Sequence, residues 1–210
     1  MIWNVPNALT MARVAAAPLV AVLFITVSRP FADLLAFLLF SSAALTDFLD
    51  GFLARRWQQQ TALGKMLDPI ADKAMVVIAL AVLLALNSLA EDVGGYIEGL
   101  RWELVIPMAV ILMREILISG LREHLGEIKI HVTPLAKWKT TVQMVAIGIG
   151  FLQGASEVLA YLFGTGPGPI SAALWSLFLA LLWTAAVLTA ISGTDYFAKA
   201  MPHLRRQEGS

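Results

Sequence analysis

Six long and almost uncharged segments dominate the sequence and restrict what the chain can fold into. Each holds about 20 mostly apolar residues, the length that an α-helix needs to cross the hydrocarbon core of a bilayer. Only 14% of the residues are charged, whereas a soluble domain carries roughly 25%. The segments are Ala8–Val27, Phe31–Leu53, Pro69–Leu89, Trp102–Leu121, Thr140–Phe163 and Ile170–Tyr196.

These segments predict an all-α, polytopic membrane protein with six transmembrane helices and a short N-terminal segment at the membrane interface. No repeat or low-complexity tract divides the chain, so a single domain over residues 1–210 is expected. The absence of cysteine excludes disulfides and thiolate chemistry. A formal net charge of zero gives no indication of a nucleic-acid partner.

The placement of lysine and arginine predicts the orientation in the membrane, because cytoplasmic loops are enriched in both residues. Of the 15 basic residues, 12 fall on one side of the predicted spans and only Arg29 and Arg101 on the other, while Arg114 lies inside the fourth span. Both termini are therefore expected in the cytoplasm.

Four aspartates interrupt this apolar pattern at the cytoplasmic ends of the second and third predicted helices. Asp47 and Asp50 are three residues apart, and Asp68 and Asp72 are four apart, so each pair shares one face of its helix. The connection between the two helices is short, and the helix ends should meet. The sequence therefore predicts that four carboxylates converge at one depth in the membrane.

Four close carboxylates would repel one another unless a cation lay among them. Hard oxygen ligands select Mg²⁺, Mn²⁺ or Ca²⁺, and two such ions roughly 4 Å apart would form a clamp for phosphoryl transfer. Two purely structural explanations of the aspartates remain. The aspartates could pair with nearby basic side chains, or serve as helix caps, as Asp68 before Pro69 would.

Small residues accompany the carboxylates. Gly51 and Ala54 lie near the Asp47 and Asp50 face, where they would let a flat group approach the backbone; close helix packing is the alternative. Gly150 and Gly154 in the fifth segment fit either a dimer contact or internal packing equally well.

The spacing Asp47-x2-Asp50-Gly51-x2-Ala54-Arg55-x8-Gly64-x3-Asp68-x3-Asp72 resembles the complete signature of the CDP-alcohol phosphotransferase family. The resemblance implies six transmembrane helices, a homodimer, and a cytoplasm-facing site where an alcohol displaces CMP from a CDP-linked lipid. It implies that Asp47, Asp50, Asp68 and Asp72 hold two divalent ions, Mg²⁺ or Mn²⁺, and that Asp72 is also the general base. The residues implied at the CDP-lipid site, besides the aspartates, are Thr46, Gly51, Ala54, Arg55, Thr61 and Gly64.

Further residues concern the acceptor. Arg114 and Arg122 in the fourth helix, with Lys137 and Lys139 at the start of the fifth, could converge on the cytoplasmic side. Arginine forks and lysine point charges suit a phosphate, so a phosphorylated acceptor is favoured. Positive-inside topology explains the two lysines equally well, whereas an arginine deep in a span usually faces a partner or a polar cavity.

The segments around Asn4-Val5-Pro6-Asn7-Ala8-Leu9-Thr10-x2-Arg13, Arg114-Glu115 and Lys137-x-Lys139-Thr140 resemble the bacterial branch of the family that uses sn-glycerol 3-phosphate. The implied reaction converts CDP-diacylglycerol and glycerol 3-phosphate to phosphatidylglycerophosphate and CMP, in the bacterial inner membrane and among its lipids. Arg114, Arg122, Lys137 and Lys139 would then bind glycerol 3-phosphate. Asn7, Thr10 and Arg13 would contact the CDP-lipid, or simply form a capped, amphipathic start to the first helix.

Other functions compete with this interpretation. A sister enzyme would use inositol phosphate, serine or phosphatidylglycerol as acceptor. A cation transporter would favour carboxylates near the bilayer midplane and interrupted helices, and a scaffold would not need clustered carboxylates.

Overall fold

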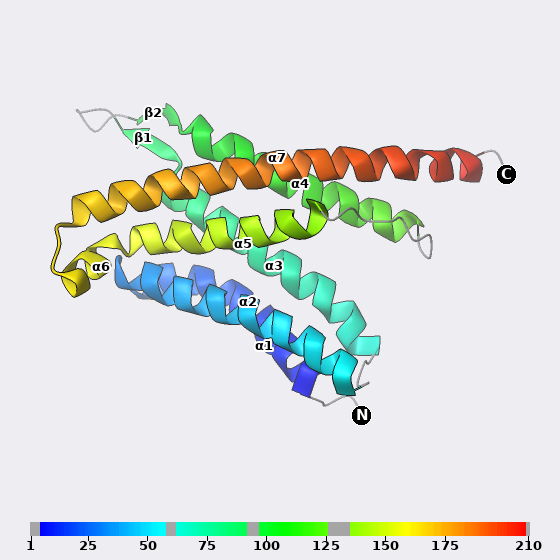
Figure 1. The fold of residues 1–210 in the computed structure, drawn as a ribbon, viewed down its shortest axis with the longest axis horizontal. Helices are drawn as coiled ribbons and strands as arrows, with labels where there is room; N and C mark the ends of the chain where they lie inside the picture. The colour runs from blue at the N-terminus through cyan, green and yellow to red at the C-terminus, as the bar shows by residue number, and fades with distance from the viewer. Residues whose placement is uncertain (1–4, 58–61, 92–96, 126–134, 209–210) are drawn as a thin grey trace. The chain divides into compact units, whose positions relative to one another are not determined.

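The structure, a computed structural model, describes residues 5–57, 62–91, 97–125 and 135–208. Side chains are described for residues 7–47, 64, 66–88, 100–125, 138–166, 168–202 and 204. Nearly all of the described chain is helical, as predicted (Figure 1). The elements in chain order are α1 (Val5–Thr26), α2 (Phe31–Trp57), α3 (Ala62–Asn87), β1 (Leu89–Glu91), β2 (Ile97–Leu100), α4 (Trp102–Leu125), α5 (Leu135–Gly154), α6 (Ser156–Phe163) and α7 (Pro167–Glu208).

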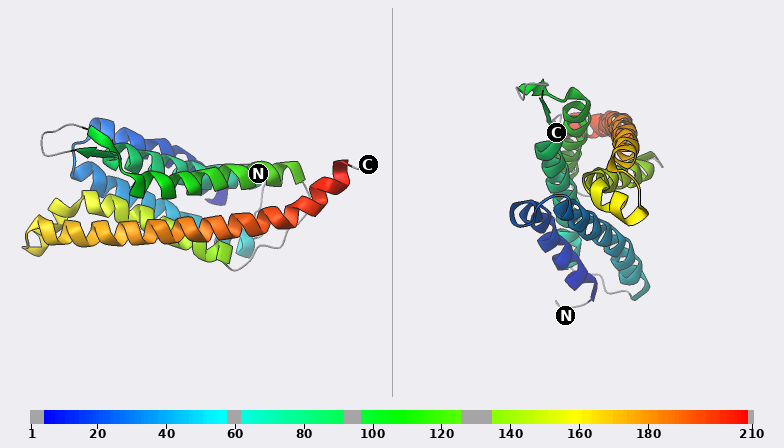
Figure 2. Two further views of the ribbon diagram at one scale, coloured as in Figure 1. Left: turned by 90° about the horizontal axis from the view of Figure 1, so that it is seen from above. Right: turned by 90° about the vertical axis from the view of Figure 1, so that its left-hand side faces the viewer.

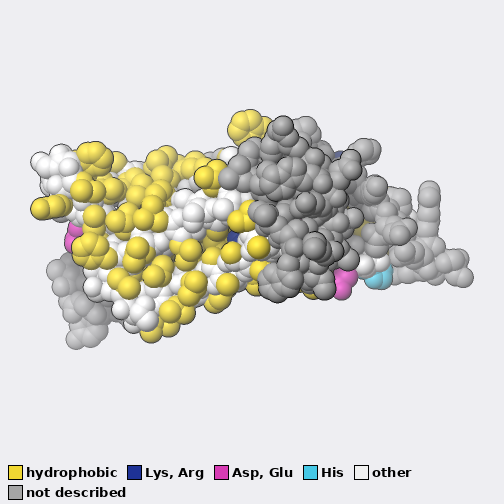
Figure 3. Space-filling model, turned by 90° about the horizontal axis from the view of Figure 1, so that it is seen from below, with side chains coloured by type: hydrophobic (Ala, Val, Ile, Leu, Met, Phe, Trp, Pro, Cys, Tyr) yellow, Lys and Arg dark blue, Asp and Glu magenta, His cyan; other side chains and the backbone are white. Residues whose placement is uncertain are grey.

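Several of these helices suit a bilayer. Among the described residues, four are long and apolar enough to cross a membrane, or five if α5 and α6 form one bent span. Hydrophobic side chains are spread over the described surface on the face in Figure 3, with few charged side chains among them, and exposed apolar surface of this kind is typical of contact with a membrane or another protein. The second predicted span lies in α2, where side chains after Asp47 are outside the described set. The count of six spans therefore stays a prediction.

The fifth predicted span is not one straight helix. Residues 140–163 were expected to be continuous, but α5 ends at Gly154, α6 begins at Ser156, and the two are bent by 71°. The break falls where the backbone of Gly154 lies against Asp33 and Arg29, so close that a Cβ atom would stand 1.9 Å from Asp33 Oδ1. Packing against another helix thus accompanies the bend.

The all-α expectation is confirmed for the described chain, apart from one short pair of strands that the sequence did not predict. Strands β1 and β2 form an antiparallel pair in which Leu89 lies opposite Leu100 and Ala90 opposite Gly99. The backbone N–H of Arg101 extends the connection by donating to the carbonyl of Ser88, at 2.6 Å. Strands of three and four residues are too short to produce a readable alternation of apolar and polar side chains.

The chain divides into two compact units. The first consists of Met1–Leu86 and Ile147–Phe178. Helices α1 and α2 pack together in it, and the ring of Phe151 lies 6.2 Å from that of Phe40. A Cβ on Gly150 would stand 2.9 Å from Leu83 Cδ1. Internal packing, one of the two readings of Gly150 and Gly154, is thereby confirmed, because both glycines lie against side chains of their own chain.

The second unit consists of Asn87–Ala146 and Leu179–Ser210. The indole rings of Trp102 and Trp183 meet edge to face within it, 6.2 Å apart. Helix α7 contributes residues to both units and is continuous over 42 residues (Figure 2). It runs beyond the predicted end at Tyr196, where Lys199 pairs with Asp195 one turn earlier at 2.7 Å, a spacing that stabilises a helix.

Candidate active site

Arg13 joins the first unit's aspartates. It projects from α1 and is buried, with 3% of its surface exposed. Its Nη1 atom donates to Oδ1 of Asp47 on α2 and, at 2.7 Å, to Oδ1 of Asp72 on α3. The two carboxyl side chains are about half exposed. A single guanidinium therefore holds carboxylates from two helices together, as the predicted convergence of α2 and α3 requires.

Thr10 supports the third aspartate. Its hydroxyl donates to Oδ1 of Asp68 at 2.8 Å. Asn7, Thr10 and Arg13 are all buried, and their spacing of three places them along one side of α1. The structural alternative, in which these residues only form a capped, amphipathic start to the helix, is wrong for Thr10 and Arg13, because both contact the aspartates. Their predicted contact with CDP-lipid stays a prediction.

The alternative that Asp68 caps a helix is also wrong. Helix α3 begins at Ala62, so Asp68 and Pro69 lie inside it and not at its start. A proline within a helix removes one backbone hydrogen bond, and membrane helices tolerate this where neighbouring groups compensate. Asp68 and Asp72 are therefore free of a capping role and lie one helical turn apart on α3.

The remaining predicted donor-site residues are described to different extents. Thr46 turns its hydroxyl to its own helix, where it donates to the carbonyl of Ala43 at 2.8 Å, and Gly64 is buried. The predicted residues that lie outside the described side chains are Asp50, Gly51, Ala54, Arg55, Thr61 and, for the acceptor, Lys137.

The described carboxylates suit a hard divalent cation chemically. Asp47 and Asp72 already share one cationic partner, and oxygen donors of this type are those that Mg²⁺ and Mn²⁺ prefer. Among the described side chains alone, no group of three or more acidic or histidine residues has the arrangement of a metal site. A complete ligand set would thus need Asp50, whose side chain is outside the described set.

A second polar cluster lies in the second unit, around Glu115. Its Oε1 atom accepts a hydrogen bond from Lys139 Nζ and one from Arg114 Nη1, the latter at 3.3 Å. Lys139 is buried, with 4% exposed. Two of the four predicted acceptor residues are therefore brought together, and Glu115, to which the sequence analysis assigned no role, is their common partner.

Glu115 was missed because neighbouring residues on a helix point in different directions. The two side chains still meet, because the arginine side chain is long enough for its guanidinium to contact the carboxylate of the next residue. The signal available in the sequence was an acidic residue beside an arginine in the middle of an apolar span, where unpaired charge is costly.

Arg122 has a different partner. Its guanidinium carbon lies 5.5 Å from the ring centre of Tyr196 on α7, within the range of a cation–π interaction. Tyr196 itself is buried, with 6% exposed. Helix α7, for which the sequence indicated little beyond hydrophobicity, therefore contributes to the surroundings of this basic residue.

The chain is similar to known proteins over nearly its whole length. Residues 3–191 match the family model described as CDP-alcohol phosphatidyltransferase. A protein of Cereibacter sphaeroides named CDP-diacylglycerol–glycerol-3-phosphate 3-phosphatidyltransferase is 46% identical over 99% of this chain and 100% of its own length. Proteins with the same name from Rickettsia bellii and Salmonella choleraesuis are 40% and 35% identical; the alignments cover 92% and 99% of this chain, and 93% and 100% of those proteins.

The matched range includes the whole aspartate motif and the basic residues of α4 and α5. The chain therefore belongs to the CDP-alcohol phosphatidyltransferase family.

Proposed function

We propose that the protein transfers the phosphatidyl group of CDP-diacylglycerol to sn-glycerol 3-phosphate, giving phosphatidylglycerophosphate and CMP. Relatives that carry the name of this activity align with nearly the whole chain. The observation that carries the proposal is the Arg13 contact to both Asp47 and Asp72, which joins the two halves of the aspartate motif.

Asp72 acts as the general base. It accepts the proton of the acceptor hydroxyl while that oxygen forms a bond to the phosphorus that carries diacylglycerol. The bond from this phosphorus to the oxygen of CMP breaks, and CMP leaves with the electron pair. The half-exposed carboxyl of Asp72 is accessible to a polar substrate, and a base must be within hydrogen-bond reach of the proton that it abstracts.

Asp47, Asp50, Asp68 and Asp72 would hold two divalent ions, Mg²⁺ or Mn²⁺. When bound, such ions offset the charge of the diphosphate and of the leaving CMP. Arg13 and Thr10 keep the carboxylates in place from α1. The other residues assigned to CDP-diacylglycerol are Asn7, Thr10, Arg13, Thr46, Gly51, Ala54, Arg55, Thr61 and Gly64.

Arg114, Arg122, Lys137 and Lys139 bind the phosphate of the acceptor. Arg114 supports this role directly, because its Nε atom is buried and has no hydrogen-bond partner among the described residues. A buried donor of this kind is unfavourable unless a ligand or water completes it. An acceptor phosphate would supply oxygen atoms that match the guanidinium fork.

The cellular setting belongs to the same proposal. The protein is a homodimer of single-domain subunits in the inner membrane of a bacterium, with six spans, a short N-terminal interfacial segment and both termini in the cytoplasm. The aspartates then lie at the cytoplasmic ends of α2 and α3, where a water-soluble acceptor can reach a lipid-linked donor.

The direct test is release of CMP by the purified protein in mixed micelles that contain CDP-diacylglycerol. Glycerol 3-phosphate should support release, and the lipid product should be phosphatidylglycerophosphate. Inositol phosphate, serine and phosphatidylglycerol serve as competing acceptors in parallel reactions. Release with one of these and none with glycerol 3-phosphate would replace the proposed reaction with that of a sister enzyme.

Chelation should stop the reaction. We expect EDTA to reduce CMP release to background, because the clustered carboxylates need divalent cations to bind a diphosphate, and we expect added Mg²⁺ or Mn²⁺ to restore it. EDTA saturated with Mg²⁺ beforehand is the control for nonspecific effects of the chelator. Undiminished turnover after chelation and dialysis would remove the metals from the proposal.

Arg114→Ala should weaken acceptor binding selectively. A charge-assisted hydrogen bond contributes about 1.5–3 kcal/mol, so the KM for glycerol 3-phosphate should rise about tenfold to 100-fold, while the KM for CDP-diacylglycerol stays within about twofold. Arg101→Ala, which removes an arginine immediately before α4, is the matched control. Equal increases in both KM values would instead indicate a structural arginine.

A further inference from the structure

Helix α7 contacts both arginines of α4, Arg114 and Arg122, through Gly193 and Tyr196. Gly193 lies beside Arg114: a Cβ atom built on this glycine would stand 3.0 Å from Arg114 Cγ and 3.8 Å from Nε. One turn further along α7, the ring of Tyr196 contacts Arg122. All four residues belong to the second compact unit, so these contacts lie within one described body.

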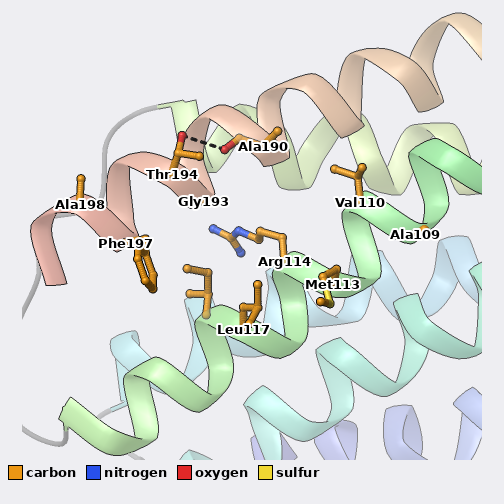
Figure 4. A pocket seen from close by; sticks show the side chains of 11 residues that line it. Ala109, Val110, Met113, Arg114, Leu117, Ala190, Gly193, Thr194, Phe197 and Ala198 are labelled. Atoms are coloured by element: carbon orange, nitrogen blue, oxygen red, sulfur yellow. Dashed lines mark hydrogen bonds between the residues drawn. The ribbon is translucent and has the colours of Figure 1, made fainter. Parts of the chain in front are cut away.

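A cavity of about 680 Å³ lies between α4 and α7, and Arg114 of α4 and Gly193 of α7 both line it (Figure 4). The guanidinium of Arg114 extends across the space between the two helices, toward α7. Apart from Arg114 and Thr194, the lining is apolar, and it includes Met113, Leu117 and Phe197.

The backbone of Gly193 lies so close to the Arg114 side chain that a Cβ atom at this position would be closer to Arg114 Cγ than ordinary packing allows. Carbon atoms in contact are normally about 3.5–4.0 Å apart, so a methyl group at this position would move the Arg114 stem by a few tenths of an ångström. The adjacent cavity leaves space for that movement. A side chain at position 193 should therefore displace Arg114 without preventing α4 and α7 from packing.

A small displacement matters for a guanidinium that binds phosphate. The fork makes two parallel hydrogen bonds only when both are aligned, and functional side chains need placement within about 0.5 Å. The shift caused by alanine approaches this tolerance, and the larger valine side chain should exceed it. Because Gly193 has no side chain, Arg114 can lie against α7 in the observed position, and this position determines where its guanidinium N–H groups point.

We infer that Gly193 is a positioning residue for the acceptor phosphate: it acts through Arg114 and sets how α4 presents this arginine. The inference rests on the proposed function, because it assumes that Arg114 binds the phosphate of the acceptor. It also assigns α7 a role in acceptor affinity in addition to membrane insertion.

Gly193→Ala and Gly193→Val test the role, with Gly120→Ala on α4 as the matched control, because a Cβ at Gly120 meets nothing within 4 Å. We expect the KM for glycerol 3-phosphate to rise several-fold in the alanine variant and toward about 100-fold in the valine variant. The KM for CDP-diacylglycerol and the Tm in detergent should match those of Gly120→Ala. An unchanged acceptor KM, or equal increases in both KM values, would overturn the inference.

A second measurement separates this inference from the proposed function. Glycerol 3-phosphate should raise the Tm of the wild type and of Gly120→Ala, and it should raise that of Gly193→Val less. If the wild type is stabilised by glycerol 3-phosphate but shows no turnover, and Gly193→Val is stabilised less, the role of Gly193 would be upheld and the proposed reaction refuted. Normal turnover with stabilisation unchanged in Gly193→Val would refute Gly193 alone, and no turnover with no stabilisation of the wild type would refute both.

Discussion

Asp72→Asn should lower turnover about 100-fold to 10,000-fold, the range in which a general base contributes to catalysis. The substitution keeps the shape of the side chain and removes its ability to accept the proton of the acceptor hydroxyl. The affinity for CDP-diacylglycerol should stay within a few-fold of the wild type, since the asparagine keeps one oxygen donor and Asp47, Asp50 and Asp68 remain to hold the divalent ions.

The variant should fold normally. The Asp72 carboxyl is 49% exposed, and its buried partner Arg13 keeps Asp47 as a second carboxylate partner, so no buried charge is left unpaired. Asp195→Asn is the matched control: this aspartate lies on α7, is 39% exposed and pairs with Lys199. It makes the same chemical change at a site with no assigned role, so its turnover should equal that of the wild type.

The measurements are CMP release under saturating substrates and donor binding by equilibrium titration. Donor binding tests the assignment in a second way, because a residue needed only to shape the site would weaken binding and turnover together. If Asp72→Asn retained more than a tenth of wild-type turnover, Asp72 would not be the base.

The sequence predicted the helices well, because lipid demands long apolar segments and these are visible without any tertiary information. It failed where neighbouring helices determine the backbone. The bend at residue 155 accompanies the approach of Gly154 to Asp33, two residues separated by 120 others in the chain. The pair of short strands, β1 and β2, was missed because three residues carry no periodic pattern.

The placement of Asp68 and Asp72 one turn apart on α3 was predictable in the same way, since a spacing of four residues fixes a shared helical face. The contacts of Arg13 were not, because they join positions 34 and 59 residues apart. The role of Gly193 could not be predicted from the sequence either, since it depends on which side chain of α4 packs against this glycine. Local periodicity specifies which residues share a face, whereas tertiary packing decides what that face meets.

Gly154→Ala should destabilise the protein strongly. The new methyl carbon would stand 1.9 Å from Oδ1 of Asp33 and 2.6 Å from Nη2 of Arg29. The Asp33 side chain cannot retreat easily, because it is completely buried and is joined to the partly exposed Arg29 by two hydrogen bonds of 2.7 and 3.1 Å. Displacing these groups leaves a completely buried carboxylate poorly paired, which is costly, so the Tm in detergent should fall markedly.

Gly148→Ala provides the control on the same helix. Its methyl group would lie 3.6 Å from the ring of Phe37, an ordinary contact, and alanine is favoured over glycine in a helix by up to about 1 kcal/mol. The same chemical change should therefore leave the Tm unchanged or raise it at position 148 and lower it at position 154. Equal Tm values for the two variants would mean that the approach of α5 to Asp33 does not exist in the folded protein.

A double-mutant cycle with Asp33→Ala identifies the cause. If the loss of stability comes from the clash with the ion pair, removing the carboxylate should remove most of the penalty of the alanine at position 154. The combined variant should then be little less stable than Asp33→Ala alone, because residues in direct contact have non-additive effects. Additive losses would place the damage in the backbone of α5 and separate it from the Arg29–Asp33 pair.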